Sequence, residues 1–104
     1  MANEYKLEVL VGLISTWMQE RGITQNGVPI GQAIKTLEET TELLSALNVN
    51  DDIEVKDAIG DIFVTLIGVC ETYGTTLEEC VNNAYDEIKD RKGHLRSDGV
   101  FVKD

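Results

Sequence analysis

The stretch KDAIGDIFVTLIGVCETYG, residues 56–74, decides the fold. Apolar side chains recur in it at helical spacing and cover most of the helix circumference, which is typical of a buried helix rather than a surface one. Upstream, Asn50 or Asp51 can act as the N-cap, and Gly74 ends the pattern after Tyr73. The sequence therefore predicts one long, buried helix from this cap to Tyr73.

Two helical segments are predicted before this central one. From Tyr5 to about Arg21 the apolar residues fall at helical spacing, and a glycine then stops the run. A loop, GITQNGVPIG at residues 22–31, follows. A second helix is expected over about residues 32–47.

A fourth helix is predicted after Thr75 or Thr76, either of which can cap it. Its first turn carries acids and its last turn carries bases, as the helix dipole favours: Glu78, Glu79, Lys89, Arg91 and Lys92. Gly93 closes this helix, and GVFVK at residues 99–103 is the one possible strand. We predict an all-α, four-helix bundle in a single domain, residues 1–104, with residues 93–104 as an extended tail.

The composition narrows the classes of function. The chain has 104 residues, 42% of them hydrophobic, and 19 acidic residues against 9 basic ones give a formal charge of -10. Such a charge repels phosphate backbones and anionic lipids, so no nucleic acid or membrane partner is expected. The sequence shows no signal peptide or apolar run long enough to span a bilayer, which predicts a cytoplasmic protein. Cys70 and Cys80 are interpreted as reduced core residues.

Three glutamates crowd the second helix, in LEETTELLSAL at residues 37–47. Glu39 and Glu42 lie about 60° apart around the helix axis, and Glu38 lies about 40° from Glu42. The apolar residues point the opposite way. Taken alone, this pattern describes a solvated helix face, since glutamates favour helices and usually lie outside.

The central helix changes this interpretation, because its apolar surface is interrupted by a narrow polar stripe. The stripe has helical spacing and consists of Glu54, Asp57, Asp61, Thr65, Gly68 and Thr72. If it faces Glu39 and Glu42 across an antiparallel helix pair, at least four carboxylates converge, and buried like charges require a cation. Carboxylates without histidine or cysteine select Mg²⁺, with Mn²⁺ as the substitute. An oxygen-only Mg²⁺ site suggests phosphate chemistry.

The two acidic segments, KTLEETTELLSAL at residues 35–47 and VKDAIGDIFVTL at residues 55–66, resemble the MazG-like all-α nucleoside triphosphate pyrophosphohydrolases. The signature of that family is Glu-x-x-Glu on one helix and Glu-x-x-Asp on the next. The resemblance covers nearly the whole chain, including the closing IKDRKGHL…DGVFVKD from residue 88, and looks like the short MazG-like proteins of phages and bacteria. It implies Mg²⁺-dependent hydrolysis of a nucleoside triphosphate, between its α and β phosphates, to a monophosphate and pyrophosphate.

The resemblance also implies roles for individual acids. Glu39, Glu42 and Asp61 match the signature and are the expected catalytic residues and metal ligands. The family pattern has glutamate where this chain has Ala58. Asp57 can supply the missing ligand from the same stripe, and Glu38 can contribute. The departure leaves open a non-catalytic alternative, an acidic helical nucleotide-binding or protein-interaction module of the same fold.

Other side chains are candidates for substrate binding. A stripe on the fourth helix resembles the asparagine and lysine residues that the family places near the triphosphate: Asn82, Tyr85, Lys89 and Lys92. The alternative for each is a solvated helix end. Trp17 can stack on a base or anchor the core, Lys35 and Lys56 are interpreted as charge-balancing surface residues, and His94 as an ordinary surface residue. The resemblance and the apolar central helix together predict a homodimer or homotetramer.

Overall fold

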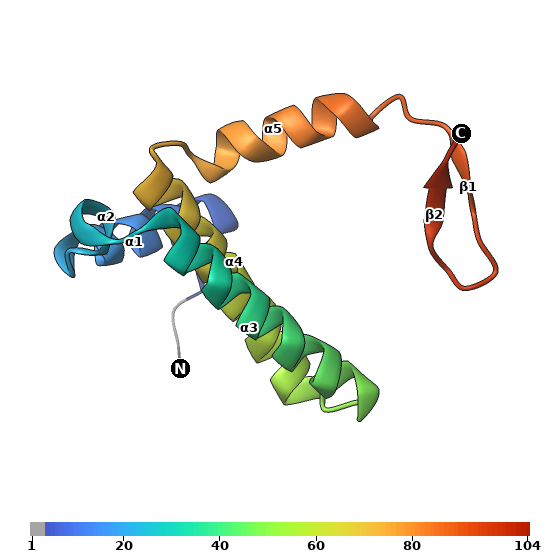
Figure 1. Cartoon of the computed structure of the whole chain (residues 1–104), viewed down its shortest axis with the longest axis horizontal. Coiled ribbons are helices and arrows are strands. Elements are labelled where there is room, and N and C mark those ends of the chain that lie inside the picture. The colour runs from blue at the N-terminus through green and yellow to red at the C-terminus, as the bar shows by residue number, and fades with distance from the viewer. Residues whose placement is uncertain (1–3) are drawn as a thin grey trace.

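The computed structural model describes residues 4–104, and within them it contains five helices and one two-stranded sheet (Figure 1). The helices are α1 (Leu7–Glu20), α2 (Ile23–Asn26), α3 (Pro29–Asn48), α4 (Asp52–Tyr73) and α5 (Leu77–Ile88). The strands β1 (Gly93–Leu95) and β2 (Phe101–Lys103) pair antiparallel, with His94 opposite Val102. The predicted all-α fold is confirmed.

The central helix α4 begins and ends where the sequence predicts. The side chain of Asp51 caps it by accepting a hydrogen bond from the Glu54 backbone N at 3.2 Å. At the other end Gly74 is left-handed, with φ of 95°, and its N donates to the Cys70 carbonyl at 2.9 Å. Glycine reaches this conformation without steric cost, so the helix stops cleanly there.

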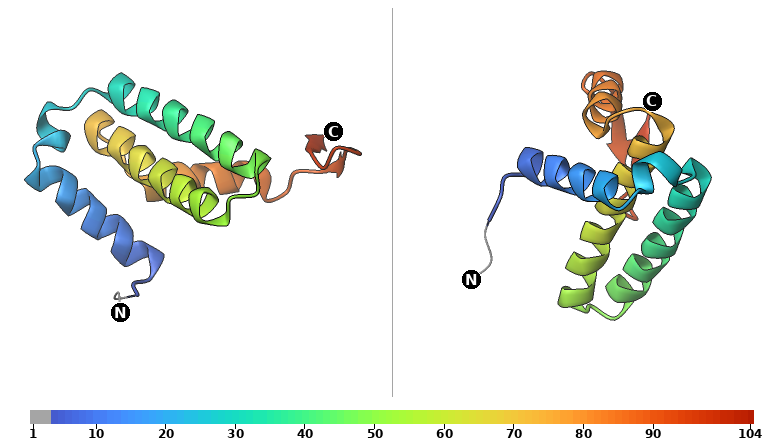
Figure 2. Two further views of the ribbon diagram at one scale, coloured as in Figure 1. Left: turned by 90° about the horizontal axis from the view of Figure 1, so that it is seen from below. Right: turned by 90° about the vertical axis from the view of Figure 1, so that its left-hand side faces the viewer.

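The helices α3 and α4 lie antiparallel and pack along their lengths, while α1 crosses α4 (Figure 2). The core is small and lies between these three helices. Its buried apolar residues are Met18, Ala46, Ala58, Ile67 and Cys70. The central helix leaves large apolar side chains exposed, since Ile53 is 79% exposed and Ile59 is 54% exposed. A single chain therefore does not provide the full burial that the sequence predicts for this helix.

The segment predicted as a loop at residues 22–31 contains the single-turn helix α2, and α3 begins at Pro29 instead of about residue 32. Proline suits the first turn of a helix, since its missing N–H has no partner there and its φ is already helical. The helix thus gains almost one turn over the prediction.

The end of α5 differs more from the prediction. Thr76 caps its start as expected, accepting a hydrogen bond from the Glu79 backbone N at 3.1 Å. The helix ends at Ile88, so the prediction that Lys89, Arg91 and Lys92 occupy its last turn is wrong. Gly93 opens β1 instead of closing the helix. A Cβ at Gly93 would collide with the carbonyl oxygen of Val102, so only glycine permits this strand pairing.

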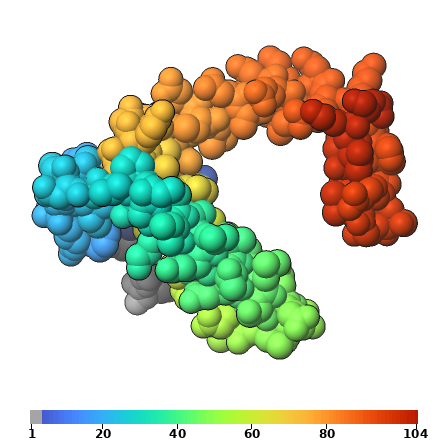
Figure 3. Space-filling view, in the orientation of Figure 1, coloured from blue at the N-terminus to red at the C-terminus, as the bar shows by residue number. Residues whose placement is uncertain are grey.

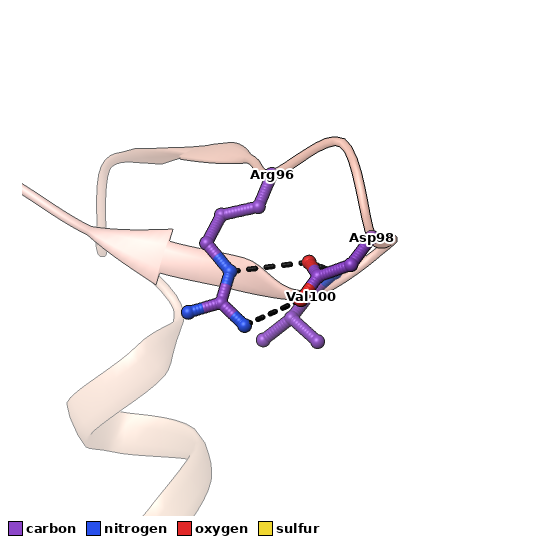
Figure 4. A network of polar contacts seen from close by, with 3 residues as sticks. All are labelled: Arg96, Asp98 and Val100. Carbon is purple, nitrogen blue, oxygen red and sulfur yellow. Dashed lines mark hydrogen bonds and ion pairs between the residues drawn. The ribbon is translucent and has the colours of Figure 1, made fainter.

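The hairpin turn is fixed by a local ion pair, shown in Figure 4. Arg96 donates to both carboxylate oxygens of Asp98, from Nε at 3.1 Å and from a terminal nitrogen at 2.6 Å, and the Val100 backbone N donates to the same carboxylate at 3.2 Å. The Arg96 guanidinium holds the pKa of Asp98 below its usual value. The strand considered possible at GVFVK is confirmed as β2.

The arm, which we define as residues 77–104, extends away from the other helices (Figures 1 and 3). Among the described helices and strands, α5 packs only against α4, and the hairpin packs against no helix. Val81, Tyr85 and Leu95 are each more than half exposed. Cys80 is exposed too, so its prediction as a core residue is wrong, whereas Cys70 is buried as predicted. No helix in residues 4–104 is long and apolar enough to cross a membrane.

Candidate functional site

The acidic residues lie on the facing helices α3 and α4, whose register is set by side-chain contacts. The hydroxyls of Thr36 and Thr65 hydrogen bond across the pair at 2.8 Å. One turn away, the amide of Gln32 lies against Gly68, so closely that a Cβ there would overlap it. Because the helices are antiparallel, one turn in the other direction places Asp61 beside Glu39 and Thr40. This part of the polar stripe, at Asp61, Thr65 and Gly68, therefore faces α3.

The acids interact electrostatically. The pKa of Glu39 is raised, first by burial, then by a hydrogen bond with Glu42, and then by the charges of Glu42, Asp61 and Asp57. The pKa of Asp61 is raised by burial and by the charges of Asp57 and Glu42. Glu39 and Asp61 thus each interact with Glu42 and Asp57. Lacking a cation, this arrangement favours partial protonation.

One atom of this cluster is unsatisfied. Oε2 of Glu39 is buried and has no hydrogen-bond partner in the structure. A buried carboxylate oxygen without a partner is costly, and a hard cation would satisfy it. Within residues 4–104, however, no three acidic, histidine or cysteine side chains stand close enough to hold a metal ion as they are placed. The donor chemistry fits Mg²⁺, and the side chains need to rotate toward a common point to bind it.

Ala58, the departure from the family signature, is only 2% exposed. The register that pairs Thr36 with Thr65 places Ala58 opposite the turn of α3 that contains Glu42. Asp57 is exposed beside it, and its charge acts on both Glu39 and Asp61. Its use as a substitute ligand remains a prediction that this placement favours. Glu38 is exposed on α3, and its role as a ligand also remains a prediction.

A hollow of about 430 Å³, which the sequence did not predict, opens beside the acids at the end of the α3–α4 pair. Its lining residues are Thr41, Glu42, Ser45, Ala46, Val49, Asp51 and Glu54. It depends on the α3–α4 turn, whose geometry comes from Asn50 in a left-handed conformation with φ of 54°. A hollow beside a carboxylate cluster gives a small ligand access to it.

The predicted substrate-binding residues lie on the arm, which does not pack against α3. Asn82 donates from Nδ2 to the Glu78 carbonyl at 2.9 Å, and Lys89 forms an ion pair with Asp86 at 3.5 Å. Tyr85 and Lys92 are exposed on the same arm. Figure 3 shows open space between the arm and the outer half of α3 and α4. The structure therefore does not bring these side chains to the carboxylates of their own chain.

Comparison with known proteins identifies the family. The sequence profile of the family described as phosphoribosyl-ATP pyrophosphohydrolase matches residues 17–88. The chain belongs to the phosphoribosyl-ATP pyrophosphohydrolase family. This family is one of the MazG-like all-α superfamily, so the resemblance found in the sequence is confirmed at the level of the superfamily. Assignment to the MazG family itself remains a prediction.

The matched region of this phosphoribosyl-ATP pyrophosphohydrolase family member contains all the candidate acids but ends before Lys89 and Lys92. The chain is also similar to an uncharacterised 18.2 kDa protein of Haemophilus phage HP1 (strain HP1c1), from its rep-hol intergenic region. The two are 36% identical over 61 residues, which are 59% of this chain and 37% of the phage protein. The chain therefore spans little more than a third of that relative's length. No solved structure matches the chain significantly.

The remaining candidate residues have ordinary surroundings. Trp17 is 44% exposed, and the guanidinium of Arg21 lies 4.5 Å from the centre of its ring, so it is not a buried anchor. Lys56 pairs with Asp52 at 3.0 Å, as expected of a charge-balancing residue. Lys35 and His94 are exposed. Glu71, which the sequence analysis did not single out, accepts hydrogen bonds from Thr24 at 2.9 Å and Gln19 at 3.3 Å, so it ties α1 and α2 to α4.

Proposed function

We propose that the protein is a Mg²⁺-dependent nucleoside triphosphate pyrophosphohydrolase, which converts an NTP or dNTP to the monophosphate and pyrophosphate. The observation that carries the proposal is the unsatisfied Glu39 oxygen within a cluster of four mutually repelling carboxylates. Membership of a pyrophosphohydrolase family supports the reaction class. Phosphoribosyl-ATP, which the family description names, is a further substrate to be tested.

In this proposal Glu39, Glu42 and Asp61 hold the cation, with Asp57 and Glu38 as additional ligands. A bound Mg²⁺, or Mn²⁺ in its place, offsets phosphate charge and lowers the pKa of an attacking water. The hollow beside Glu42 leaves room for phosphate groups next to these acids.

The cationic side chains require a second copy of the chain. Residues 1–88 carry 4 basic and 16 acidic residues, a net charge of -12, whereas residues 89–104 carry 5 basic and 3 acidic residues, a net charge of +2. The basic end of the arm is thus complementary to the acidic surface of α3 and α4. We infer a homo-oligomer in which Asn82, Tyr85, Lys89 and Lys92 of one chain reach the substrate at the acids of another.

The exposed apolar surface supports assembly independently of charge. A groove of about 730 Å³ runs between α1, α4 and α5, and its lining is mostly apolar, including Val11, Phe63 and Val81. Large apolar surfaces of this kind are typical of protein interfaces. A sedimentation mass equal to one chain at micromolar concentration would contradict this assembly.

The proposed activity is tested by pyrophosphate release from a panel of NTPs, dNTPs and phosphoribosyl-ATP, with and without Mg²⁺. We expect Mg²⁺-dependent release by the wild type, loss of at least about 100-fold in Asp61→Asn, and little change in Glu87→Gln, which removes an acid from the exposed surface of α5. No release from any substrate with Mg²⁺ or Mn²⁺ present would refute the proposal.

The alternative function is a non-catalytic nucleotide-binding or protein-interaction module, and the burial of Ala58 favours it. A methyl group stands where the family signature has a carboxylate, so the cluster has one ligand fewer at its buried side. This alternative predicts Mg²⁺-dependent nucleotide binding without pyrophosphate release. Calorimetric titration with a non-hydrolysable triphosphate, run beside the activity assay, separates the two functions.

A further inference from the structure

Two thiols meet at the junction between α4 and α5. Cys70 lies in the last turns of α4, and Cys80 lies in the first turn of α5. Thr75, in the short connection, contacts both residues: its backbone N donates to the Cys70 carbonyl at 3.0 Å, and its hydroxyl oxygen is 3.9 Å from Cys80 Sγ. The side chain of Cys80 also lies near enough to the Cys70 thiol to raise its pKa. The fold therefore brings together residues ten positions apart.

The two thiols differ in their surroundings. Cys70 is 7% exposed and lines a small cavity of about 250 Å³ with Ser15, Thr76 and Leu77. Burial, followed by the proximity of Cys80, raises the pKa of the Cys70 thiol. Cys80 is exposed to solvent. An oxidant in solution therefore reaches Cys80 first, and Cys70 is positioned to react with the product.

We propose that Cys70 and Cys80 form an intramolecular disulfide when the protein meets a peroxide, and that this bond fixes the direction of the arm. In the first step Cys80 Sγ attacks one peroxide oxygen, the O–O bond breaks, and a sulfenic acid and one water form. In the second step Cys70 Sγ attacks Cys80 Sγ, the S–O bond breaks, and a second water leaves. Two thiols are oxidised and one peroxide is reduced, so the electrons balance.

The position of the bond gives it a structural effect. Among the described elements α5 packs only against α4, and the connection is just Gly74, Thr75 and Thr76. Gly74 adopts the left-handed conformation, and as a glycine it is the residue of the connection with the greatest backbone freedom. A covalent link across this junction restricts rotation of α5 about Gly74. The oxidised arm holds one orientation, and the reduced arm samples more of them. This inference does not depend on the proposed function.

The inference is tested on the chain of 104 residues with hydrogen peroxide at a small molar excess. We expect the intact mass to fall by two hydrogens without dimer formation. Trypsin leaves both cysteines in one peptide, so digestion with a glutamate-specific protease is needed. Cleavage after Glu71 or Glu79 separates the cysteines, and a bridged pair of peptides then identifies the bond. Dithiothreitol should reverse the change.

Two further measurements complete the test. Cys80→Ser, a conservative change at an exposed position, should prevent bridging without altering the fold. Amide hydrogen exchange in α5 should slow in the oxidised wild type and stay unchanged in peroxide-treated Cys80→Ser. Over-oxidation of Cys80 with Cys70 still free, or a disulfide between two chains, would overturn the assignment. Unchanged exchange in α5 despite a complete bridge would overturn its effect on the arm.

Discussion

Binding of Mg²⁺ at the acid cluster should stabilise the fold. A cation that binds only the folded chain stabilises it by about 2.7 kcal/mol at a concentration about 100-fold above its Kd. For 104 residues the entropy of unfolding near Tm is about 0.22 kcal/mol per degree. The melting temperature of the wild type should therefore rise by about 12 °C, measured by differential scanning calorimetry between metal-free and Mg²⁺-saturated samples.

The variant Asp61→Asn should lose at least half of this rise. Removing one carboxylate ligand weakens affinity by at least about tenfold, which leaves a rise of about 6 °C or less at the same Mg²⁺ concentration. Glu87→Gln removes the same charge from the exposed surface of α5 and should keep the full rise. Equal shifts in all three proteins would mean that the cation acts by general screening of the -10 net charge, and would refute the metal site.

Three other results are expected. If Asp57 supplies the ligand missing at Ala58, Asp57→Ala should reduce hydrolysis about as severely as Asp61→Ala. Adding Ala58→Glu to Asp57→Ala should restore part of the hydrolysis. Unchanged hydrolysis in Asp57→Ala would confine the site to the other acids. Mixing Asp61→Asn with a Lys89→Ala, Lys92→Ala double variant should restore activity, because in a mixed oligomer the intact arm of the first variant meets the intact acids of the second. No restoration would mean that the arm acts on its own chain. Since burial and neighbouring charges raise the pKa values of Glu39 and Asp61 in the fold, metal-free stability should fall as pH rises above about 4, where these carboxylates ionise in the unfolded chain. Urea unfolding of a Glu39→Gln, Asp61→Asn variant should show a smaller fall.

Much of the fold could be predicted because the signals are local. Asp51 and Thr76 cap helices through side chains that reach only three residues ahead, and Gly74 ends α4 through its own backbone freedom. The end of α5 could not be predicted in this way. Gly93 leaves the helical pattern because it pairs with Lys103, a partner that sequence periodicity does not reveal.

The candidate site could likewise be predicted only where it depends on local sequence patterns. Helical spacing places the acids of α3 on one face and those of α4 on another, and the antiparallel pairing brings the two faces together. The unsatisfied oxygen of Glu39 depends on how neighbouring side chains cover it, which spacing does not determine. The position of Lys89 depends on the angle of α5 at the junction after Gly74, and no local pattern fixes that angle.

The short turn between α3 and α4 also affects the order in which the chain folds. Only Val49, Asn50 and Asp51 separate the two helices, so closing this loop costs little entropy, and chains dominated by such local contacts fold quickly. We expect the α3–α4 pair to form first, with α1 docking afterwards through Met18 and the arm ordering last. The four carboxylates would then meet early, while the rest of the chain is still unfolded. A divalent cation would accordingly accelerate folding and change the rate of unfolding little.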